Sequence, residues 1–179
     1  TTQQIALALR IVSGLSVAQI AKAFLVTEAA MEQRITRAKA RIGRAGIPFE
    51  PPGPVDRIAR LGAVAAMIYL VFNEGYTTQA AAGDARQSLS AEAIRLARLL
   101  LSLYPSEPEI MGLLALFLLQ ASRAPARFAP DGTAVPLERQ DRTLWHGPEI
   151  AEGLALMDKA IRHGRPGPYQ VQAAIAALH

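Results

Sequence analysis

The stretch GLSVAQIAKAFLVTEAAMEQRITRAKARIGRA, residues 14–45, decides the fold of the first part of the chain. Ser16 is a preferred N-cap residue, and the helix that it begins carries apolar residues at helical spacing: Val17, Ile20, Ala21 and Phe24. After a turn at Leu25-Val26, Thr27 is a second N-cap, and Glu28 favours the positive end of a second helix. The stretch therefore predicts a helix-turn-helix, in which the small side chain of Ala21 lets the two helices cross closely.

The second helix of this motif has one apolar side and one basic side. Its apolar residues recur at steps of four, three and four, which predicts a buried face: Met31, Ile35, Ala38 and Ile42. Its arginines recur at steps of three, four and three: Arg34, Arg37, Arg41 and Arg44. Such a helix can pack one face on its partner helix and present the other to phosphates and base edges in the major groove of DNA.

The positive charge of the chain is concentrated in this part. The formal net charge is +4, and residues 1–50 carry this whole excess, whereas acidic and basic residues balance over residues 51–179. An uneven distribution of this kind is typical of a nucleic-acid-binding module joined to a module of another type.

Residues 14–39 resemble region 4 of extracytoplasmic-function (ECF) sigma factors, which direct RNA polymerase to promoters. The resemblance implies recognition of the promoter −35 element and contact with the flap of the polymerase β subunit. By position, it places five residues nearest the DNA: Thr27, Glu28, Gln33, Arg34 and Arg37. By their chemistry, Gln33 suits adenine, an arginine suits guanine, and Lys39 and Arg41 suit phosphates.

A proline-rich segment separates this motif from the rest of the chain. Prolines restrict their predecessors and remove backbone donors, so we expect a DNA-binding domain at residues 1–47, a linker at 48–54 and a helical domain at 55–179. Helical spacing without sustained two-residue alternation predicts an all-α protein. The expected helices cover roughly residues 3–13, 17–24, 28–44, 55–73, 90–104, 108–122, 148–163 and 168–178.

Four stretches beyond the linker resemble the C-terminal extension of one ECF subgroup: residues 69–76, 89–98, 141–145 and 167–179. In that subgroup the extension is similar to tetratricopeptide repeats (TPR), so the resemblance implies TPR-like helical hairpins that regulate activity through protein contacts. Region 2, which in this family binds the polymerase clamp and opens the −10 element, has no counterpart in these residues. The expected partners of the extension are therefore the missing N-terminal sigma region, polymerase or a regulatory protein.

The sequence Asn73-Glu74-Gly75-Tyr76 has two interpretations. In the first, Gly75 is a left-handed cap after the helix, and Tyr76 folds back onto that helix. In the second, Asn73, Glu74 and Tyr76 form the polar lip of a groove that binds a partner.

Three further residues are candidates for contacts in the helical domain. Trp145 is expected to anchor a loop on the hairpins, and Tyr169 and Gln172 are expected to line a concave partner-binding surface.

Catalytic and metal-binding patterns are missing from the sequence. The chain has no cysteine, which excludes a thiolate metal site and a cysteine nucleophile. Its histidines, His146, His163 and His179, have no second ligand at helical spacing. There is no phosphate-binding glycine loop and no nucleophile elbow. We therefore expect neither enzymatic activity nor a cofactor.

Membrane insertion and secretion are not expected either. The longest apolar run, residues 61–72, has 12 residues, whereas a membrane span needs roughly 20. No secretory signal opens the sequence, and the absence of cysteine suits a reducing, cytoplasmic location.

Two other classes of protein remain open. One is a one-component helix-turn-helix regulator whose helical domain binds a ligand or dimerises. The other is a protein-interaction scaffold in which the basic helix only increases solubility.

Overall fold

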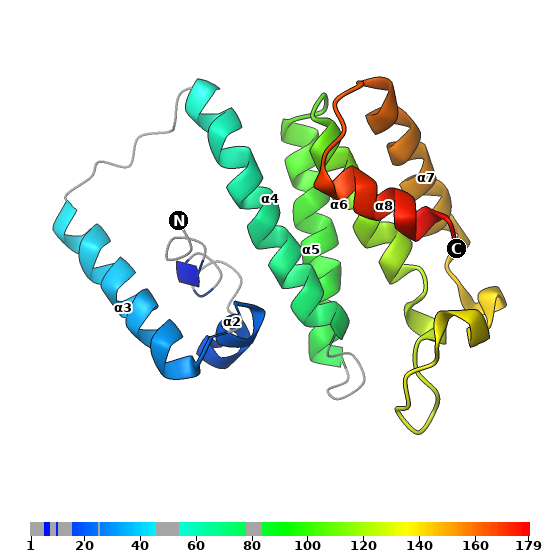
Figure 1. Ribbon diagram of the computed structural model, residues 1–179, viewed down its shortest axis with the longest axis horizontal. Helices are drawn as coiled ribbons and strands as arrows, with labels where there is room; N and C mark the ends of the chain where they lie inside the picture. The colour runs from blue at the N-terminus through cyan, green and yellow to red at the C-terminus, as the bar shows by residue number, and fades with distance from the viewer. Residues whose placement is uncertain (1–5, 8–9, 11–15, 25, 46–53, 78–83) are drawn as a thin grey trace. The chain divides into compact units, whose positions relative to one another are not determined.

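The computed structural model describes residues 6–7, 10, 16–24, 26–45, 54–77 and 84–179, and Figure 1 shows its helices. Within these residues the fold is all-helical, as predicted, and an isolated bridge between Phe128 and Ala134 is the extent of its β-structure. The α-helices are α2 (Val17–Ala23), α3 (Glu28–Ala45), α4 (Pro54–Thr77), α5 (Asp84–Leu103), α6 (Pro108–Ala121), α7 (Gly147–Arg162) and α8 (Pro168–Ala177). The helix predicted at 3–13 and the linker at 48–54 fall largely outside the described residues.

The region between α6 and α7 is an extended connection with three short 3₁₀ turns, in agreement with the gap between the helices predicted at 108–122 and 148–163. These turns are η2 (Ala124–Ala126), η3 (Leu137–Arg139) and η4 (Arg142–Leu144). The internal contacts of the chain divide it into two compact units, Thr1–Val71 and Phe72–His179.

In the first unit, α2 packs against α3. Ile20 and Ala21 of α2 are buried, and so is one side of α3: Met31, Ile35 and Ala38. Ile42 was expected on this buried face, but 60% of its surface is exposed. The physical reason is length, because α2 has seven residues and α3 has 18. The buried part of the α3 face therefore ends at Ala38.

The end of α4 corrects one interpretation of the sequence. The helix runs through Gly75 to Thr77, so Gly75 is a buried helical residue and not a left-handed cap. Among the described glycines, positive φ angles occur at Gly132 and Gly164. Packing explains the longer helix, because the ring of Tyr76 stacks on that of Phe72 one turn earlier, with 5.5 Å between centroids.

In the second unit, α6 is the central helix and packs against α5, α7 and α8. Its residues are buried from Ile110 through Leu119. A helix that is apolar on all sides needs neighbours on all sides, and α5, α7 and α8 meet that need.

Two glycines allow these neighbours to approach closely. A Cβ added at Gly112 of α6 would lie 2.7 Å from the backbone nitrogen of Gln170 in α8. A Cβ added at Gly153 of α7 would lie 3.0 Å from Cγ of Leu119. At Gly112 the contact is with backbone, so an added methyl group would force α8 to move. At Gly153 the nearest atom belongs to the Leu119 side chain, which would have to give way by a few tenths of an ångström.

Helix α8 is held at one end by Glu109 of α6 and at the other by Arg123, two residues after the end of α6. At the first turn of α8, the Glu109 carboxylate accepts hydrogen bonds from the backbone N–H groups of Tyr169 (3.1 Å) and Gln170 (3.3 Å). At the last turn, the buried guanidinium of Arg123 donates to the carbonyl oxygen of Ala176. Negative charge at a helix N-terminus and positive charge at its C-terminus both complement the helix dipole. The start of α6 contacts the start of α8, and Arg123, just after the end of α6, contacts the end of α8. The two helices therefore run in the same direction.

Arg127 holds the end of α4 in the same way. Its guanidinium donates to the carbonyl oxygen of Tyr76 at 2.7 Å and lies 3.5 Å from the centroid of the Tyr76 ring. The Tyr76 hydroxyl donates to Oε1 of Gln120 at 2.7 Å, and Phe72 stacks on Phe117 at 4.2 Å. The last turn of α4 is thereby fastened to α6 and to the turn that follows α6.

The close packing of α6 on α8 predicts that Gly112→Ala lowers the free energy of unfolding by about 1–3 kcal/mol, because the added methyl group overlaps Gln170. Urea denaturation measures this difference. The matched control is Gly62→Ala in α4, where the added group meets no atom within 4 Å among the described residues, its own turn of helix apart. That variant should be neutral or more stable, since alanine favours helices by up to about 1 kcal/mol. Equal losses in the two variants would contradict the packing.

The environment of Tyr76 predicts a loss of stability at high pH. Burial raises the pKa of the Tyr76 hydroxyl, although Arg127 and Arg123 act in the opposite direction. An unfolded tyrosine ionises near pH 10, below the raised folded pKa. The contribution of Tyr76 is therefore complete below about pH 10 and is lost as pH rises through the folded value. The free energy of unfolding should fall over this window, and less steeply in Tyr76→Phe than in Tyr104→Phe. Parallel pH curves for both variants would contradict this prediction.

Candidate nucleic-acid interface

The turn between α2 and α3 is capped as the sequence predicts. Oγ1 of Thr27 accepts a hydrogen bond from the backbone N–H of Ala30 at 3.3 Å, and the carbonyl oxygen of Thr27 accepts one from Met31 at 3.0 Å. The N–H of Val26 donates to the carbonyl oxygen of Ala21 at 3.0 Å and closes the end of α2. These bonds set the start of α3, and hence which residues of α3 face α2.

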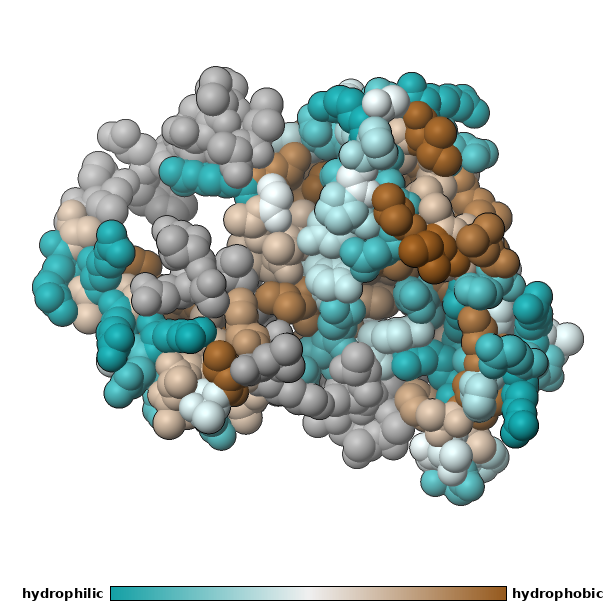
Figure 2. Space-filling view, viewed as in Figure 1, coloured by the Kyte–Doolittle hydropathy of each residue, from teal (hydrophilic) through white to brown (hydrophobic). Residues whose placement is uncertain are grey.

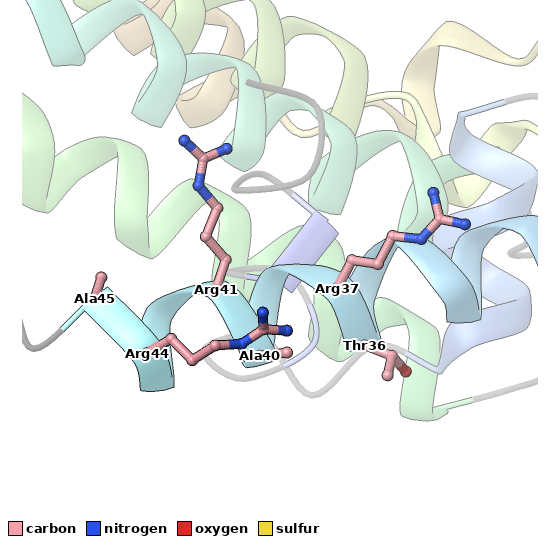
Figure 3. A pocket seen from close by; sticks show the side chains of 6 residues that line it. All are labelled: Thr36, Arg37, Ala40, Arg41, Arg44 and Ala45. Carbon is pink, nitrogen blue, oxygen red and sulfur yellow. The ribbon is translucent and has the colours of Figure 1, made fainter.

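The side of α3 that does not pack on α2 carries most of the predicted DNA-binding residues. Gln33, Arg37, Arg41 and Arg44 are exposed, and Arg34, which lies nearer the buried face, is half-buried. A surface hollow runs along this side and is lined by Thr36, Arg37, Ala40, Arg41, Arg44 and Ala45. In Figure 3, Arg37 and Arg41 extend away from the helix to the same side. We call Gln33, Arg34, Arg37, Arg41 and Arg44 the arginine face.

One hydrogen bond orders the middle of this face. The Nη2 group of Arg37 donates to Oε1 of Gln33, one helical turn earlier, at 3.0 Å. The bond holds both side chains over the same part of the helix. The amide nitrogen of Gln33 and the remaining guanidinium donors of Arg37 stay available to a ligand.

The cations of the arginine face are not neutralised by carboxylates within the described part of the chain. The ion pairs found there are Arg95–Glu92, Arg98–Glu152, His146–Glu149 and Arg165–Glu107, all in the second unit. Figure 2 shows hydrophilic side chains along α3. Exposed guanidinium groups of this kind suit phosphate groups as partners.

Lys39, Thr27 and Glu28 lie apart from the arginine face. At about 100° per residue, Lys39 falls on the same flank of α3 as Glu28 and Glu32, across the buried side from Arg34 and Arg41. All three of these flank residues are exposed, as is Thr27 at the start of the helix. The predicted DNA-binding set is therefore spread over the N-terminus and two flanks of one helix.

The predicted partner-binding residues Asn73, Glu74 and Tyr76 lie in the last turns of α4. Glu74 is buried, with 6% of its surface exposed, so it does not form the lip of an open groove. Tyr76 is engaged with Arg127 and Gln120. Asn73 is half-buried and, like Glu74, already has an interaction partner. The contacts of Tyr76 hold the end of α4 against Gln120 and Arg127.

Trp145, which the sequence predicts to anchor a loop, lies close to two guanidinium groups. Its half-buried ring has the guanidinium of Arg123 at 5.0 Å on one side and that of Arg142 at 5.4 Å. The next residue, His146, donates its backbone N–H to the carbonyl oxygen of Ser122 at 2.9 Å. The ring and this bond together close the base of the long connection between α6 and α7.

Tyr169 and Gln172 lie on α8. Both are half-buried and have interaction partners, and the backbone N–H of Tyr169 is held by Glu109. Sequence analysis missed the roles of Glu109, Arg123 and Arg127, because each acts on a helix far away in the sequence. A weak signal existed for Glu109, since the Gly167-Pro168 start of α8 offers backbone donors without a side-chain cap.

The described residues contain neither a metal-binding group of side chains nor a helix that could span a membrane. No group of three or more histidine, aspartate or glutamate side chains is arranged to hold a metal ion there. No described helix has the length and apolar character that crossing a membrane requires.

Comparison with known families gives two matches. Residues 1–42 match the model of sigma-70, region 4, and residues 60–161 match a family of unknown function, DUF6596. The region 4 match points to DNA binding by the N-terminal residues and to a role related to transcription.

A relative matches nearly the whole length of this chain. An uncharacterized protein of Rhizobium meliloti (strain 1021) is 70% identical over 178 residues, which cover 99% of this chain and 42% of that protein. The chain thus spans less than half the length of this relative. No solved structure matches the chain. Because the DUF6596 model covers more than half of the residues, the chain belongs to this family of unknown function, and it carries a sigma-70 region 4 at its N-terminal end.

Proposed function

We propose that the chain is part of an ECF sigma factor and recognises the promoter −35 element through α3. The observation that carries this proposal is the arginine face, which is solvent-facing and free of carboxylate partners among the described residues. In the proposed complex, α2 supports α3 from behind, and the arginine face enters the major groove.

The positions around α3 suggest a role for each residue. Gln33 and Arg37 lie together in the middle of the exposed side, so they contact base edges, with glutamine suited to adenine and arginine to guanine. Arg34 and Arg41 on one flank, and Lys39 on the other, contact the phosphates that border the groove. Thr27 and Glu28 are at the helix N-terminus, where Thr27 keeps its capping role and both approach the DNA.

The second unit acts in this proposal as a TPR-like regulatory extension. Three features support the TPR-like label: α6 and α8 run in the same direction, α7 lies between them in sequence, and α6 packs on both. In a repeat array, equivalent helices of successive hairpins have this relation. The extension would regulate a cytoplasmic initiation complex through contacts with sigma region 2 or polymerase, while region 4 contacts the β flap.

The proposal predicts that Arg37→Ala combined with Arg41→Ala weakens binding to duplex DNA and reduces its salt dependence. Loss of the phosphate contact assigned to Arg41 reduces the magnitude of the slope of log K against log salt by about 0.9, and loss of Arg37 removes a contact to base edges. Fluorescence anisotropy with random-sequence duplexes at several salt concentrations measures both quantities. The control is Arg139→Ala combined with Arg162→Ala, which removes the same charge from exposed positions in the second unit. An equal effect in both double variants would mean that net charge alone determines the affinity for DNA, and would contradict the proposal.

Base recognition is tested separately with Gln33→Ala. Selection of bound duplexes from a random pool should show a defined preference for the unaltered chain and a relaxed preference at one position for the variant, with an unchanged salt slope. A variant that selects the same sequences as the unaltered chain would exclude Gln33 from base recognition.

A further inference from the structure

The two flanks of α3 carry opposite charge. At about 100° per residue, the flank that lies about 60–140° from Met31 in one direction carries the four arginines of the arginine face. The flank that lies about 60–100° from Met31 in the other direction carries Glu28, Glu32 and Lys39, which are all exposed. We call these three residues the acidic flank. The formal charge is +4 from four arginines on one flank, and −1 from two carboxylates and one ammonium group on the other.

Glu32 is the least compensated charge of the acidic flank. Neither Glu28 nor Glu32 forms an ion pair with another residue in the described part of the chain. Glu28 lies in the first turn of α3, where the partial positive charge of the helix N-terminus offsets part of its own charge. Lys39 follows Glu32 by seven residues, which is about 10 Å along the helix axis and too far for an ion pair.

The hollow on the surface of α3 lies on the side of the arginines. Arg37, Arg41 and Arg44 line it, and the described lining residues include none of the acidic flank. Figure 3 shows Arg37 and Arg41 extending to the same side of the helix. Ala40, which also lines the hollow, has only a methyl group and leaves room for a phosphate group beside these guanidinium groups. The shape of the surface therefore favours the same flank as its charge.

We propose that α3 takes most of its phosphate contacts from one DNA strand, and that Glu32 causes this asymmetry by repelling the phosphates of the other strand. The inference rests on the proposed function, because it requires α3 in the major groove. The backbones of the two strands border that groove, so a helix that has its buried side turned away from the DNA presents one flank to each strand.

Charge then distinguishes the two strands. The arginine face attracts the phosphates beside it, whereas the like charge of Glu32 disfavours close approach of the phosphates on the opposite border. Lys39 contacts this second strand about two helical turns further along α3. The second strand therefore gains one contact and one repulsion, and the first strand gains several contacts.

Methylphosphonate scanning tests this asymmetry, because each substitution removes the charge of one chosen phosphate. The duplex is one that the unaltered chain selects from a random pool, and both strands are substituted one phosphate at a time. On the strand beside the arginine face, neighbouring substitutions should each weaken binding by at least about threefold. On the other strand, one substitution should weaken binding near Lys39. Another, near Glu32, should strengthen it by about twofold to fivefold, the effect of one like charge at roughly 4–8 Å in water.

Glu32→Gln identifies the source of the repulsion. The variant removes one negative charge and keeps the length and the helix propensity of the side chain. It should bind the unmodified duplex about twofold to fivefold more tightly, and the gain from the methylphosphonate near residue 32 should disappear. The matched control is Glu138→Gln, which removes the same charge from an exposed position in the second unit. The control should leave both the affinity and the methylphosphonate gain unchanged.

The outcomes separate this inference from the proposed function. Equal losses from both strands, or a methylphosphonate gain that persists in Glu32→Gln, would overturn the inference and leave recognition of DNA by α3 standing. A chain that selects no sequence from the random pool would contradict the proposed function, and the inference with it.

Discussion

The contact between α2 and α3 is the constraint on which the functional interpretation depends. Burial of Met31, Ile35 and Ala38 against α2 fixes the rotation of α3 about its own axis. Because a helix turns by about 100° per residue, fixing one face also fixes the other. The hydrogen bonds of Thr27 then set where α3 begins. A different rotation would turn the arginine face towards the protein, where its unpaired charges would be costly to bury.

The second unit is organised around one apolar helix, α6, which other helices must surround. Gly112 and Gly153 let α8 and α7 approach α6, and Glu109 and Arg123 fix the position of α8 along it. Arg127 adds the end of α4 to the same assembly. Charged groups here have a structural role, because each satisfies backbone groups at a helix end.

Local signals in the sequence were sufficient for much of this structure. N-cap residues, prolines at helix starts and apolar spacing predicted α2, α3, α6, α7 and α8 to within one residue at most ends. The arginine face follows from spacing alone, because it depends on one helix and its nearest neighbour in sequence. The exposure of Arg37 and Arg41 could be expected for the same reason.

Features that depend on distant residues could not be predicted. Gly75 suggested a helix end, but Phe72 and Gln120 hold Tyr76 in a further helical turn. Ile42 continued an apolar pattern that the short α2 does not cover. The apolar spacing of Val171, Ile175 and Leu178 was visible in the sequence. Only the position of α6 shows which side of α8 is already packed and which remains exposed.

Affinity cleavage of DNA tests the central claim most directly, because the chain has no cysteine and a single reactive cysteine can be introduced. Ala40→Cys lies among the arginine-face residues, and Asp158→Cys lies on the exposed side of α7. Each variant is coupled to an iron chelate that cuts nearby DNA. If α3 occupies the major groove, the chelate at residue 40 cuts the bound duplex at a defined position, and that at residue 158 does not. Bound DNA that is cut equally from both positions, or from neither, would contradict the account.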